Sequence, residues 1–217
     1  MIYALVGRSY SGKEAIARYI RKYYSGTVRR FVKYTTNMGA GHKRFSHMPI
    51  AQYRALNPEE IFYTTEAGGH MIFAKKSQFT ADRDVTYIVD DPMGIDKIDE
   101  LGIPYVIIYV TSPRDVLLER AVAACTSIQE VKSRYLFTDA RMINFKRGGS
   151  YNFYVDTSIV SEKTIRTILD FFLAGVDAWK ESHLSALHPP FICEAFGDDW
   201  LSGAVSAGFL QAPIEVT

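Results

Sequence analysis

The segment Ile2-Tyr-Ala-Leu-Val6 is a short apolar run, and Gly7-Arg-Ser-Tyr-Ser-Gly-Lys13 follows it directly. An apolar run of this length that ends at a glycine predicts a buried strand. Apolar residues at helical spacing after Lys13 predict a helix over 13–24, which Ser25-Gly26 would stop. The chain therefore opens with a strand, a tight turn and a helix.

The turn between this strand and this helix fits the pattern G-x-x-x-x-G-K. Glycines let the backbone wrap closely around an anion, so that successive N–H groups point at phosphate oxygens. A lysine at the helix start reaches the β- and γ-phosphates as a point charge. The alternative is a glycine turn that only joins a strand to a helix. We expect a site for the triphosphate of ATP, formed by Gly7, Arg8, Ser9, Tyr10, Ser11, Gly12, Lys13 and Glu14.

Carboxylates stand where this kind of loop needs Mg²⁺ ligands. The pattern usually continues with Ser or Thr, whose hydroxyl holds the ion, but here the residue is Glu14. A carboxylate is also a hard oxygen ligand, so it either binds Mg²⁺ or repels the phosphates. Asp90 and Asp91 directly follow a second apolar run, 85–89. P-loop enzymes place a magnesium ligand at this strand end. The alternative interpretation is a polar strand end before a proline turn. We expect Glu14 and Asp90 to hold the metal.

Strands and helices alternate along most of the chain. This rhythm predicts an α/β fold of three layers, with a parallel central sheet covered on both faces. The stretch 29–79 interrupts it and is rich in Tyr, Thr and Gly, which indicates an inserted β-rich subdomain. After residue 183 the composition changes again, and we expect 183–217 to pack on the domain or, in a homodimer, on a second copy. The predicted strands are 2–6, 85–89, 105–110 and 151–155, and the predicted helices are 13–24, 96–101, one opening at Pro113, and 161–179.

Composition places the chain among ordinary globular proteins. It has 217 residues, 47% of them hydrophobic and 23% charged, with a net charge of +1, which excludes disordered, collagen-like and coiled-coil classes. Its two cysteines, Cys125 and Cys193, form no metal or redox motif and suggest a reducing compartment, most simply the cytoplasm. No apolar run reaches the ~18 residues that a membrane span needs, so we expect no membrane partner.

Charge is unevenly distributed despite this balance. Between residues 15 and 58 there is no Asp or Glu, whereas nine Lys and Arg residues alternate with seven aromatic ones. One interpretation is a solvated face whose acidic partners come from elsewhere in the chain. The other is a surface for a polyanion, either nucleotide phosphates or a DNA strand.

Three further segments support a resemblance to a known family. They are Val32-Lys-Tyr-Thr-Thr-Asn37, the strand end Tyr87-Ile-Val-Asp-Asp-Pro-Met-Gly94, and the strand-to-helix segment from Tyr105 to Arg120. Together with the phosphate loop, and in this order, they resemble the guanylate kinase family of nucleoside monophosphate kinases. The resemblance covers roughly residues 1–180 and implies a P-loop kinase domain over 1–182.

The resemblance implies ATP as donor, a GMP-type acceptor in the inserted subdomain, and a helical lid over 120–147 whose arginines clamp the phosphates. By position, Lys13, Asp91 and Arg134 would carry the catalysis, with Arg120 and Arg141 as further lid candidates. The acceptor would contact Lys33, Tyr34, Thr35, Thr36, Asn37, Arg44, Asp91 and Arg141.

The acceptor side departs from the family pattern. Lys33 and Asn37 stand where the family has Ser and then Arg, and Tyr63 replaces the Glu that reads guanine. A carboxylate distinguishes guanine by accepting from its N1 and N2 donors, so its loss removes that selectivity. Ala123 or Ala124 replaces one lid arginine.

The function we expect is an ATP-dependent kinase that uses Mg²⁺ and a changed nucleotide-type acceptor. One alternative is a DNA kinase that phosphorylates a hydroxyl of a modified base, such as a hydroxymethylated pyrimidine, and holds the strand on 15–58. That reaction needs a base, for which Asp90, Asp91 and Glu66 are candidates. A third hypothesis is a non-catalytic module that binds a nucleotide or nucleic acid.

Overall fold

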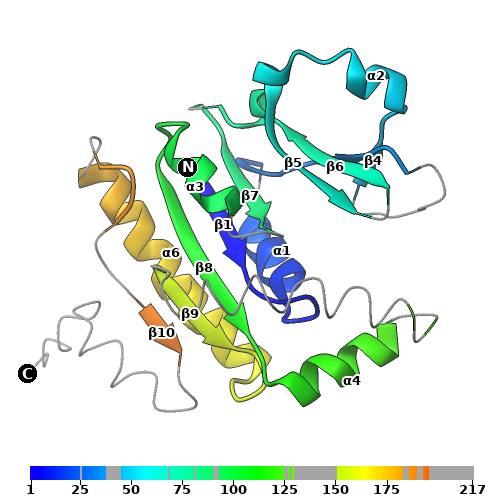
Figure 1. The fold of residues 1–217 in the computed structure, drawn as a ribbon. Helices are drawn as coiled ribbons and strands as arrows, with labels where there is room; N and C mark the ends of the chain where they lie inside the picture. The colour runs from blue at the N-terminus through cyan, green and yellow to red at the C-terminus, as the bar shows by residue number, and fades with distance from the viewer. Residues whose placement is uncertain are drawn as a thin grey trace, which may run out of the picture.

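The computed structural model describes residues 1–24, 26–37, 45–67, 69–80, 82–89, 93–124, 127, 129, 151–182, 186–189 and 193–195. Two sheets organise this part of the chain, a larger central one and a smaller one beside its edge (Figure 1).

The central sheet has six strands in the order β10-β9-β8-β1-β7-β2, and every neighbouring pair is parallel. The predicted parallel central sheet of an α/β fold is thus confirmed. Its central strands β1 and β8 read as nearly continuous apolar runs because both faces of the sheet are covered there. They are β1 (Ile2–Val6), β2 (Val28–Arg30), β7 (Asp84–Ile88), β8 (Tyr105–Thr111), β9 (Phe153–Asp156) and β10 (Cys193–Ala195).

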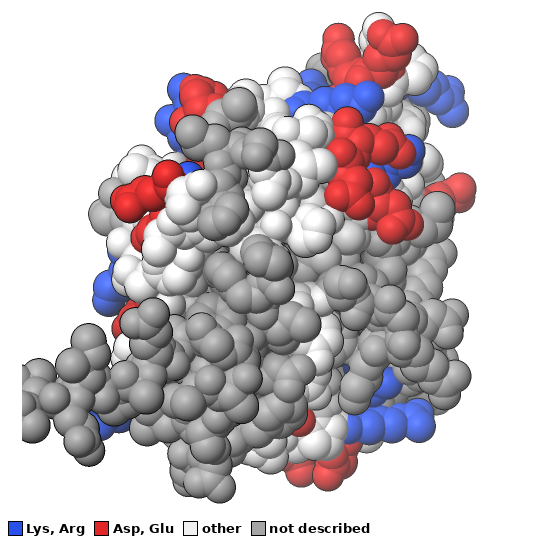
Figure 2. Space-filling view, turned by 90° about the vertical axis from the view of Figure 1, so that its left-hand side faces the viewer, with Lys and Arg blue, Asp and Glu red and all other residues white. Residues whose placement is uncertain are grey.

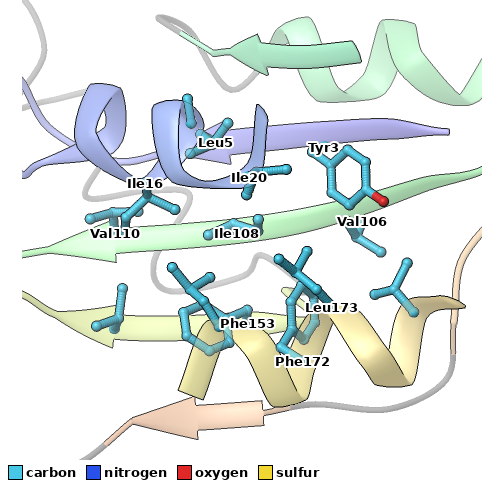
Figure 3. Close-up of a cluster of buried hydrophobic side chains, with 14 of the residues drawn as sticks. Tyr3, Leu5, Ile16, Ile20, Val106, Ile108, Val110, Phe153, Phe172 and Leu173 are labelled. Atoms are coloured by element: carbon cyan, nitrogen blue, oxygen red, sulfur yellow. The ribbon is translucent and has the colours of Figure 1, made fainter. Parts of the chain in front are cut away.

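Two amphipathic helices, α1 (Lys13–Tyr23) and α6 (Glu162–Ser182), cover one face of this sheet. Ile16 and Ile20 of α1 pack toward Leu5 of β1, and Phe172 of α6 lies 5.0 Å, centroid to centroid, from Phe153 of β9 (Figure 3). Burial of these apolar stripes supplies the main driving force that holds the helices on the sheet.

The other face of the sheet is packed against α3 (Met93–Asp99) and against part of the smaller sheet. Ile95 and Ile98 of α3 are buried there, in the same cluster as Tyr87 and Phe79. After β8, the chain enters α4 (Arg114–Ala124), whose Leu117 and Ala121 are buried.

The smaller sheet lies between β2 and β7 in sequence and has the order β4-β3-β6-β5. An aromatic cluster joins it to the central sheet, with Phe62 of β5 4.6 Å from Phe79 and 5.8 Å from Tyr87 of β7 between ring centroids. Its elements are β3 (Lys33–Thr35), β4 (Phe45–His47), α2 (Ile50–Arg54), the short 3₁₀ turns Pro58–Glu60 and Lys76–Gln78, β5 (Ile61–Ala67) and β6 (His70–Lys75).

The boundary between the two sheets differs from the predicted start of the insertion at residue 29. Arg29 pairs with Val85 of β7, so Arg29 and Arg30 belong to the central sheet. Their strand lies at the sheet edge, where exposed basic side chains are common. Val28 is the only buried residue of this strand and its only apolar one, so the strand has little apolar pattern by which it could be predicted.

Part of the C-terminal extension lies along the opposite edge of the central sheet. Cys193 to Ala195 form β10, which pairs with β9. Upstream of this strand, Asn152 Nδ2 donates to the carbonyl of Pro189 at 2.9 Å, and Tyr105 N donates to that of Leu187 at 2.8 Å. These bonds join the segment before β10 to the start of β8 and β9.

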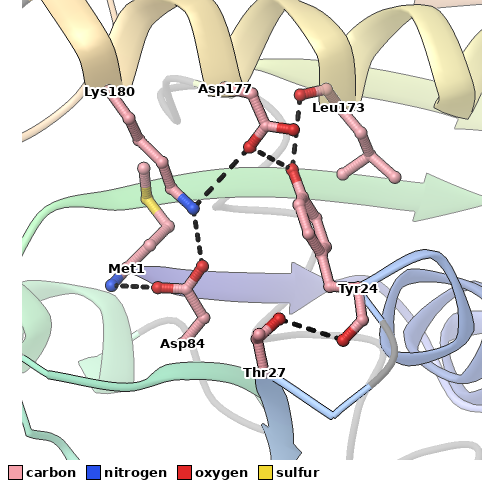
Figure 4. Close-up of polar contacts among 7 residues, drawn as sticks. All are labelled: Met1, Tyr24, Thr27, Asp84, Leu173, Asp177 and Lys180. Atoms are coloured by element: carbon pink, nitrogen blue, oxygen red, sulfur yellow. Dashed lines mark hydrogen bonds and ion pairs between the residues drawn. The ribbon is translucent and has the colours of Figure 1, made fainter.

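Acidic residues outside the 15–58 stretch bind some of its polar groups. Asp177 of α6 accepts from the Tyr24 hydroxyl at 2.7 Å (Figure 4). A carboxylate oxygen of Asp177 also lies 3.8 Å from the Lys180 ammonium, and the same ammonium lies 2.6 Å from a carboxylate oxygen of Asp84. The Met1 ammonium donates to the other oxygen of Asp84 at 2.8 Å. Burial, reinforced by Asp177, raises the pKa of Tyr24 above its ordinary value, so this tyrosine stays protonated.

Within the described part of the chain, none of the helices combines the length and the apolar character that crossing a membrane requires.

Candidate active site around the phosphate loop

The loop from Gly7 to Lys13 has the backbone of a tight anion-binding turn. Gly7 and Gly12 have φ angles of 142° and 98°, and Tyr10, at 67°, has the only positive φ among the non-glycine residues that the structure describes. A Cβ on Gly7 would lie 1.9 Å from the carbonyl oxygen of Val110, so only glycine lets β1 end this close to β8. Strained backbone of this kind is concentrated at ligand sites.

The Lys13 side chain is folded back across the loop that precedes it. Its ammonium donates to the carbonyl oxygens of Gly7 and Arg8, each at 2.5 Å, and the residue is 9% exposed. The first amides of α1 have no acceptor inside the helix, and the helix dipole places partial positive charge at the same end. Ser11 Oγ is fully buried in this loop and has no hydrogen-bond partner among the described residues. This loop therefore fits a polyphosphate.

Glu14 does not fill the loop. Its carboxylate lies 3.8 Å from the guanidinium of Arg30 at the end of β2, and both side chains are partly exposed. Burial lowers the pKa of the nearby Arg21 guanidinium, and the negative charge of Glu14 partly offsets this shift. Glu14 is thus paired with a cation next to the loop, which reduces its repulsion of a phosphate.

A hydrogen-bonded cluster supports the loop from the side of α4. Arg120 donates from Nη1 to the carbonyl of Tyr10 at 3.3 Å and to Oγ1 of Thr157 at 2.8 Å. Thr157 donates in turn to the carbonyl of Ser11 at 3.0 Å, and its Oγ1 lies 2.7 Å from Oγ of Ser112. The ends of β8 and β9, α4 and the phosphate loop meet in this cluster.

The sequence motifs place Arg120 only among the lid candidates, and they do not single out Ser112 or Thr157. The available signal was the pair of polar residues that follow the ends of two predicted strands. Carboxyl ends of parallel strands lie at one edge of a sheet, where ligands bind in open α/β folds.

The predicted acceptor residues from Lys33 to Asn37 form β3 and the turn after it. Thr35 accepts from the amide of Asn37 at 3.2 Å, and Thr36 accepts from the amide of Met71 at 3.0 Å, so both hydroxyls have structural partners. The Tyr34 ring stacks on Phe73 at 5.3 Å. Lys33 faces the central sheet, with its ammonium 5.4 Å from the Tyr87 ring centre.

Five predicted site residues lie outside the described part of the chain: Arg44, Asp90, Asp91, Arg134 and Arg141. Their expected roles stay predictions. Within the described ranges, no three His, Cys, Asp or Glu side chains come together in a way that would hold a metal ion.

Comparisons with known proteins agree with this architecture. No protein-family model matches the chain, and neither does any curated protein. Among solved structures, guanylate kinase from Anaplasma phagocytophilum is similar, with a TM-score of 0.50 and 16% sequence identity over 85% of this chain and 94% of that chain. The fold is therefore guanylate kinase-like, as the sequence motifs indicated, and at this identity the likeness concerns the fold.

Proposed function

We propose that this protein is an ATP-dependent P-loop kinase that transfers the γ-phosphoryl group to a nucleotide-type acceptor. The observation that carries the proposal is the phosphate loop, with its two positive-φ glycines and the Lys13 ammonium held across it. The guanylate kinase-like fold gives this loop a kinase context.

Phosphoryl transfer needs positioning and charge neutralisation more than covalent chemistry. An acceptor oxygen would attack the γ-phosphorus while the bond to the β–γ bridging oxygen breaks, and ADP would leave. Amides of the loop would orient the donor, and Lys13 would exchange its carbonyl partners for phosphate oxygens. When the acceptor is a phosphate oxygen, it is already deprotonated and needs no general base.

Mg²⁺ would neutralise charge on the β- and γ-phosphates. Glu14 fits this ion by its chemistry, since it is a hard oxygen donor adjacent to Lys13, and Asp90 is the predicted second ligand. Asp91 and Arg134, which lie outside the described residues, would take the catalytic roles that the family resemblance implies. Arg120 would keep the loop in place while these groups act, because it donates to the carbonyl of Tyr10.

An acceptor screen tests the proposal. We expect γ-labelled ATP with Mg²⁺ to label at least one nucleoside or deoxynucleoside monophosphate, and Lys13→Ala to abolish the transfer. Binding of ATP without transfer to any acceptor would instead favour a non-catalytic binding module. Failure to bind ATP would contradict both.

A second candidate, a kinase that acts on a modified base within DNA, is favoured by the cations of α1 and β2. Arg18 and Lys22 of α1 and Arg29 of β2 are exposed, and none of the three forms an ion pair with the described residues. Burial lowers the pKa of Arg21, and the positive charges of Arg30 and Arg18 lower it further against the opposing effect of Glu14, so Arg18 and Arg30 lie near Arg21. A cluster of cations next to a phosphate loop suits a phosphodiester backbone.

The described part of the face drawn in Figure 2 shows no comparable cluster of cations. Lys and Arg side chains there lie beside Asp and Glu side chains, so that no field of a single sign extends over it. The DNA reaction is tested by replacing the mononucleotides with oligonucleotides that carry hydroxymethylated pyrimidines. Label in the oligonucleotide, lost at high salt and in an Arg18→Ala, Lys22→Ala double variant, would support it.

A further inference from the structure

Tyr10 holds a strained backbone conformation at the centre of the phosphate loop. Its φ is 67°, the only positive value among the non-glycine residues that the structure describes. Glycine adopts this conformation without steric cost, whereas a residue with a Cβ is destabilised by it. Strained residues cluster at active sites and ligand clamps, where the surrounding structure holds them in place. A tyrosine at this position therefore indicates a role that glycine could not fill.

Two donors hold the backbone on either side of the peptide between Tyr10 and Ser11. Arg120 donates to the carbonyl of Tyr10 at 3.3 Å, and Thr157 donates to that of Ser11 at 3.0 Å. Both donors belong to one cluster, since Arg120 also donates to Oγ1 of Thr157 at 2.8 Å. The carbonyl and the amide of a trans peptide point in opposite directions, so the amides of Ser11 and Gly12 point away from this cluster. Contacts to the backbone thus impose the strained conformation.

Tyr10 lies midway around a loop that Lys13 closes. The Lys13 ammonium donates to the carbonyls of Gly7 and Arg8, and so joins the end of the loop to its beginning. Tyr10 is three residues from Gly7 and three from Lys13, so its Cα lies within about 11 Å of the Cα atoms of both. The lysine of such a loop binds the β- and γ-phosphates. A tyrosine side chain is long enough to reach from this position to the terminal phosphate.

The Tyr10 side chain suits the exclusion of water from this phosphate. Tyr10 is the only aromatic residue between Gly7 and Lys13, and it is half-buried. A kinase has to keep water from the terminal phosphate of ATP, because water competes with the acceptor as nucleophile. An aromatic ring displaces water and brings no charge next to the phosphates. Glycine at this position would leave that space to solvent.

We propose that Tyr10 shields the γ-phosphate of bound ATP from water and so favours transfer to the acceptor over hydrolysis. The proposal rests on the proposed function, because it concerns the specificity of the same site. In the side reaction, a water oxygen attacks the γ-phosphorus while the bond to the β–γ bridging oxygen breaks. The products are ADP and inorganic phosphate, and one proton of the water passes to the solvent.

Three variants of Tyr10 separate the effect of the ring from that of the backbone strain. Tyr10→Phe keeps both, Tyr10→Ala keeps the strain without the ring, and Tyr10→Gly removes both. Tyr23→Ala is the control, because it removes a tyrosine of α1 that is 43% exposed and lies outside the loop. Release of phosphate from ATP with Mg²⁺ is measured without an acceptor, and urea unfolding curves report the stability of each protein.

Hydrolysis should follow the ring, and stability should follow the strain. We expect Tyr10→Ala and Tyr10→Gly to release phosphate about 10-fold faster than the wild type, and Tyr10→Phe and Tyr23→Ala to stay within about 2-fold of it. The urea midpoint of Tyr10→Gly should lie above that of Tyr10→Ala, because glycine relieves the strain. Since Tyr10→Gly is the more stable of the two, faster hydrolysis by it cannot result from unfolding.

Fluorescence gives a readout that does not depend on turnover. The emission of Tyr10→Trp, after subtraction of the wild-type signal, is recorded with ADP and with a non-hydrolysable ATP analogue. A side chain next to the γ-phosphate should respond to the analogue and only weakly to ADP. Equal changes with the two nucleotides would overturn the proposed shield.

The outcomes distinguish the shield from the kinase activity. Faster hydrolysis by Tyr10→Ala and Tyr10→Gly, with no transfer to any nucleotide acceptor by the wild type, would support the shield and refute the proposed function. Transfer to an acceptor by the wild type, together with unchanged hydrolysis in both variants, would overturn the shield and leave the kinase proposal intact.

Discussion

Arg120 of α4 donates from Nη1 to the backbone carbonyl of Tyr10, 3.3 Å away, and so joins the helix after β8 directly to the phosphate loop. Tyr10 has a φ of 67°, a conformation that costs a non-glycine residue roughly 1–2 kcal/mol. The same guanidinium also bonds Thr157 and Ser112. Arg120 therefore helps to hold a strained turn in place.

Replacement of Arg120 should loosen the loop more than it destabilises the fold. We expect Arg120→Ala to raise the apparent KM for ATP roughly 10-fold, because the carbonyl of Tyr10 and the hydroxyl of Thr157 lose a charged donor. The neighbouring Glu119 is exposed on the same helix and forms no hydrogen bond or ion pair with the described residues, so Glu119→Ala is the control. Equal changes in ATP binding by Arg120→Ala and Glu119→Ala would contradict the positioning role. The role would also be wrong if Arg120→Ala had the same effect in a Tyr10→Gly background as in the wild type.

Glu14 and Arg30 should be coupled. With Arg30→Ala, the carboxylate of Glu14 loses its neighbouring cation and repels the phosphates more strongly, so we expect ATP to bind a few-fold more weakly; exposed pairs are worth only about 0–1 kcal/mol. In a Glu14→Ser background, the same Arg30 change should have little effect. A titration of all four proteins with ATP in the absence of Mg²⁺, where Glu14 faces the phosphates without an ion between them, forms the cycle, and additive effects would show that the two side chains act independently.

Gly7 should be intolerant of any side chain. A Cβ there would lie 1.9 Å from the carbonyl oxygen of Val110, so Gly7→Ala should destabilise the protein by about 2–4 kcal/mol as well as impair ATP binding. Gly102 is the matched control: its φ is 62°, but a Cβ on it would meet nothing within 4 Å. Gly102→Ala should cost only about 1–2 kcal/mol, from backbone strain alone. Urea unfolding curves that show equal losses would contradict the contact with β8.

The polar cluster at the other end of the sheet should contribute to stability. Asp84 is partly buried and lies 2.6 Å from the ammonium of Lys180, so Asp84→Asn should lower the free energy of unfolding by about 1–3 kcal/mol. The exposed pair between Glu162 and Arg166 is the comparison, and Glu162→Gln should change stability by less than about 0.5 kcal/mol. A greater loss in the Glu162 variant would show that burial does not decide the strength of these pairs.

Much of the fold could be predicted because its signals are local in the sequence. The apolar run at 105–110 became β8 (Tyr105–Thr111), and the periodic segment at 161–179 became α6 (Glu162–Ser182). The edge strands escaped prediction: β2 has one buried residue of three, and β10 consists of Cys193, Glu194 and Ala195. Such edge strands have weak apolar patterns, because proteins keep edge strands short and place charged side chains on them.

The candidate site likewise has one part that a local sequence pattern predicts and another part that no local pattern predicts. The phosphate loop is contiguous, so its pattern predicted it directly. The cluster of Arg120 and Thr157 joins residues 37 positions apart, and the contact of Lys33 with Tyr87 joins residues of two different sheets. Such contacts depend on strand order, which a single sequence does not encode as a local pattern.

The most direct test of the central claim, that the loop from Gly7 to Lys13 holds the triphosphate of ATP, is an equilibrium titration of the wild type and of Lys13→Ala with ATP, ADP and AMP in Mg²⁺. We expect ATP to bind more tightly than ADP and much more tightly than AMP, and Lys13→Ala, still folded by circular dichroism, to lose this preference. Equal affinity for all three nucleotides, or unchanged ATP binding by the folded Lys13 variant, would contradict it.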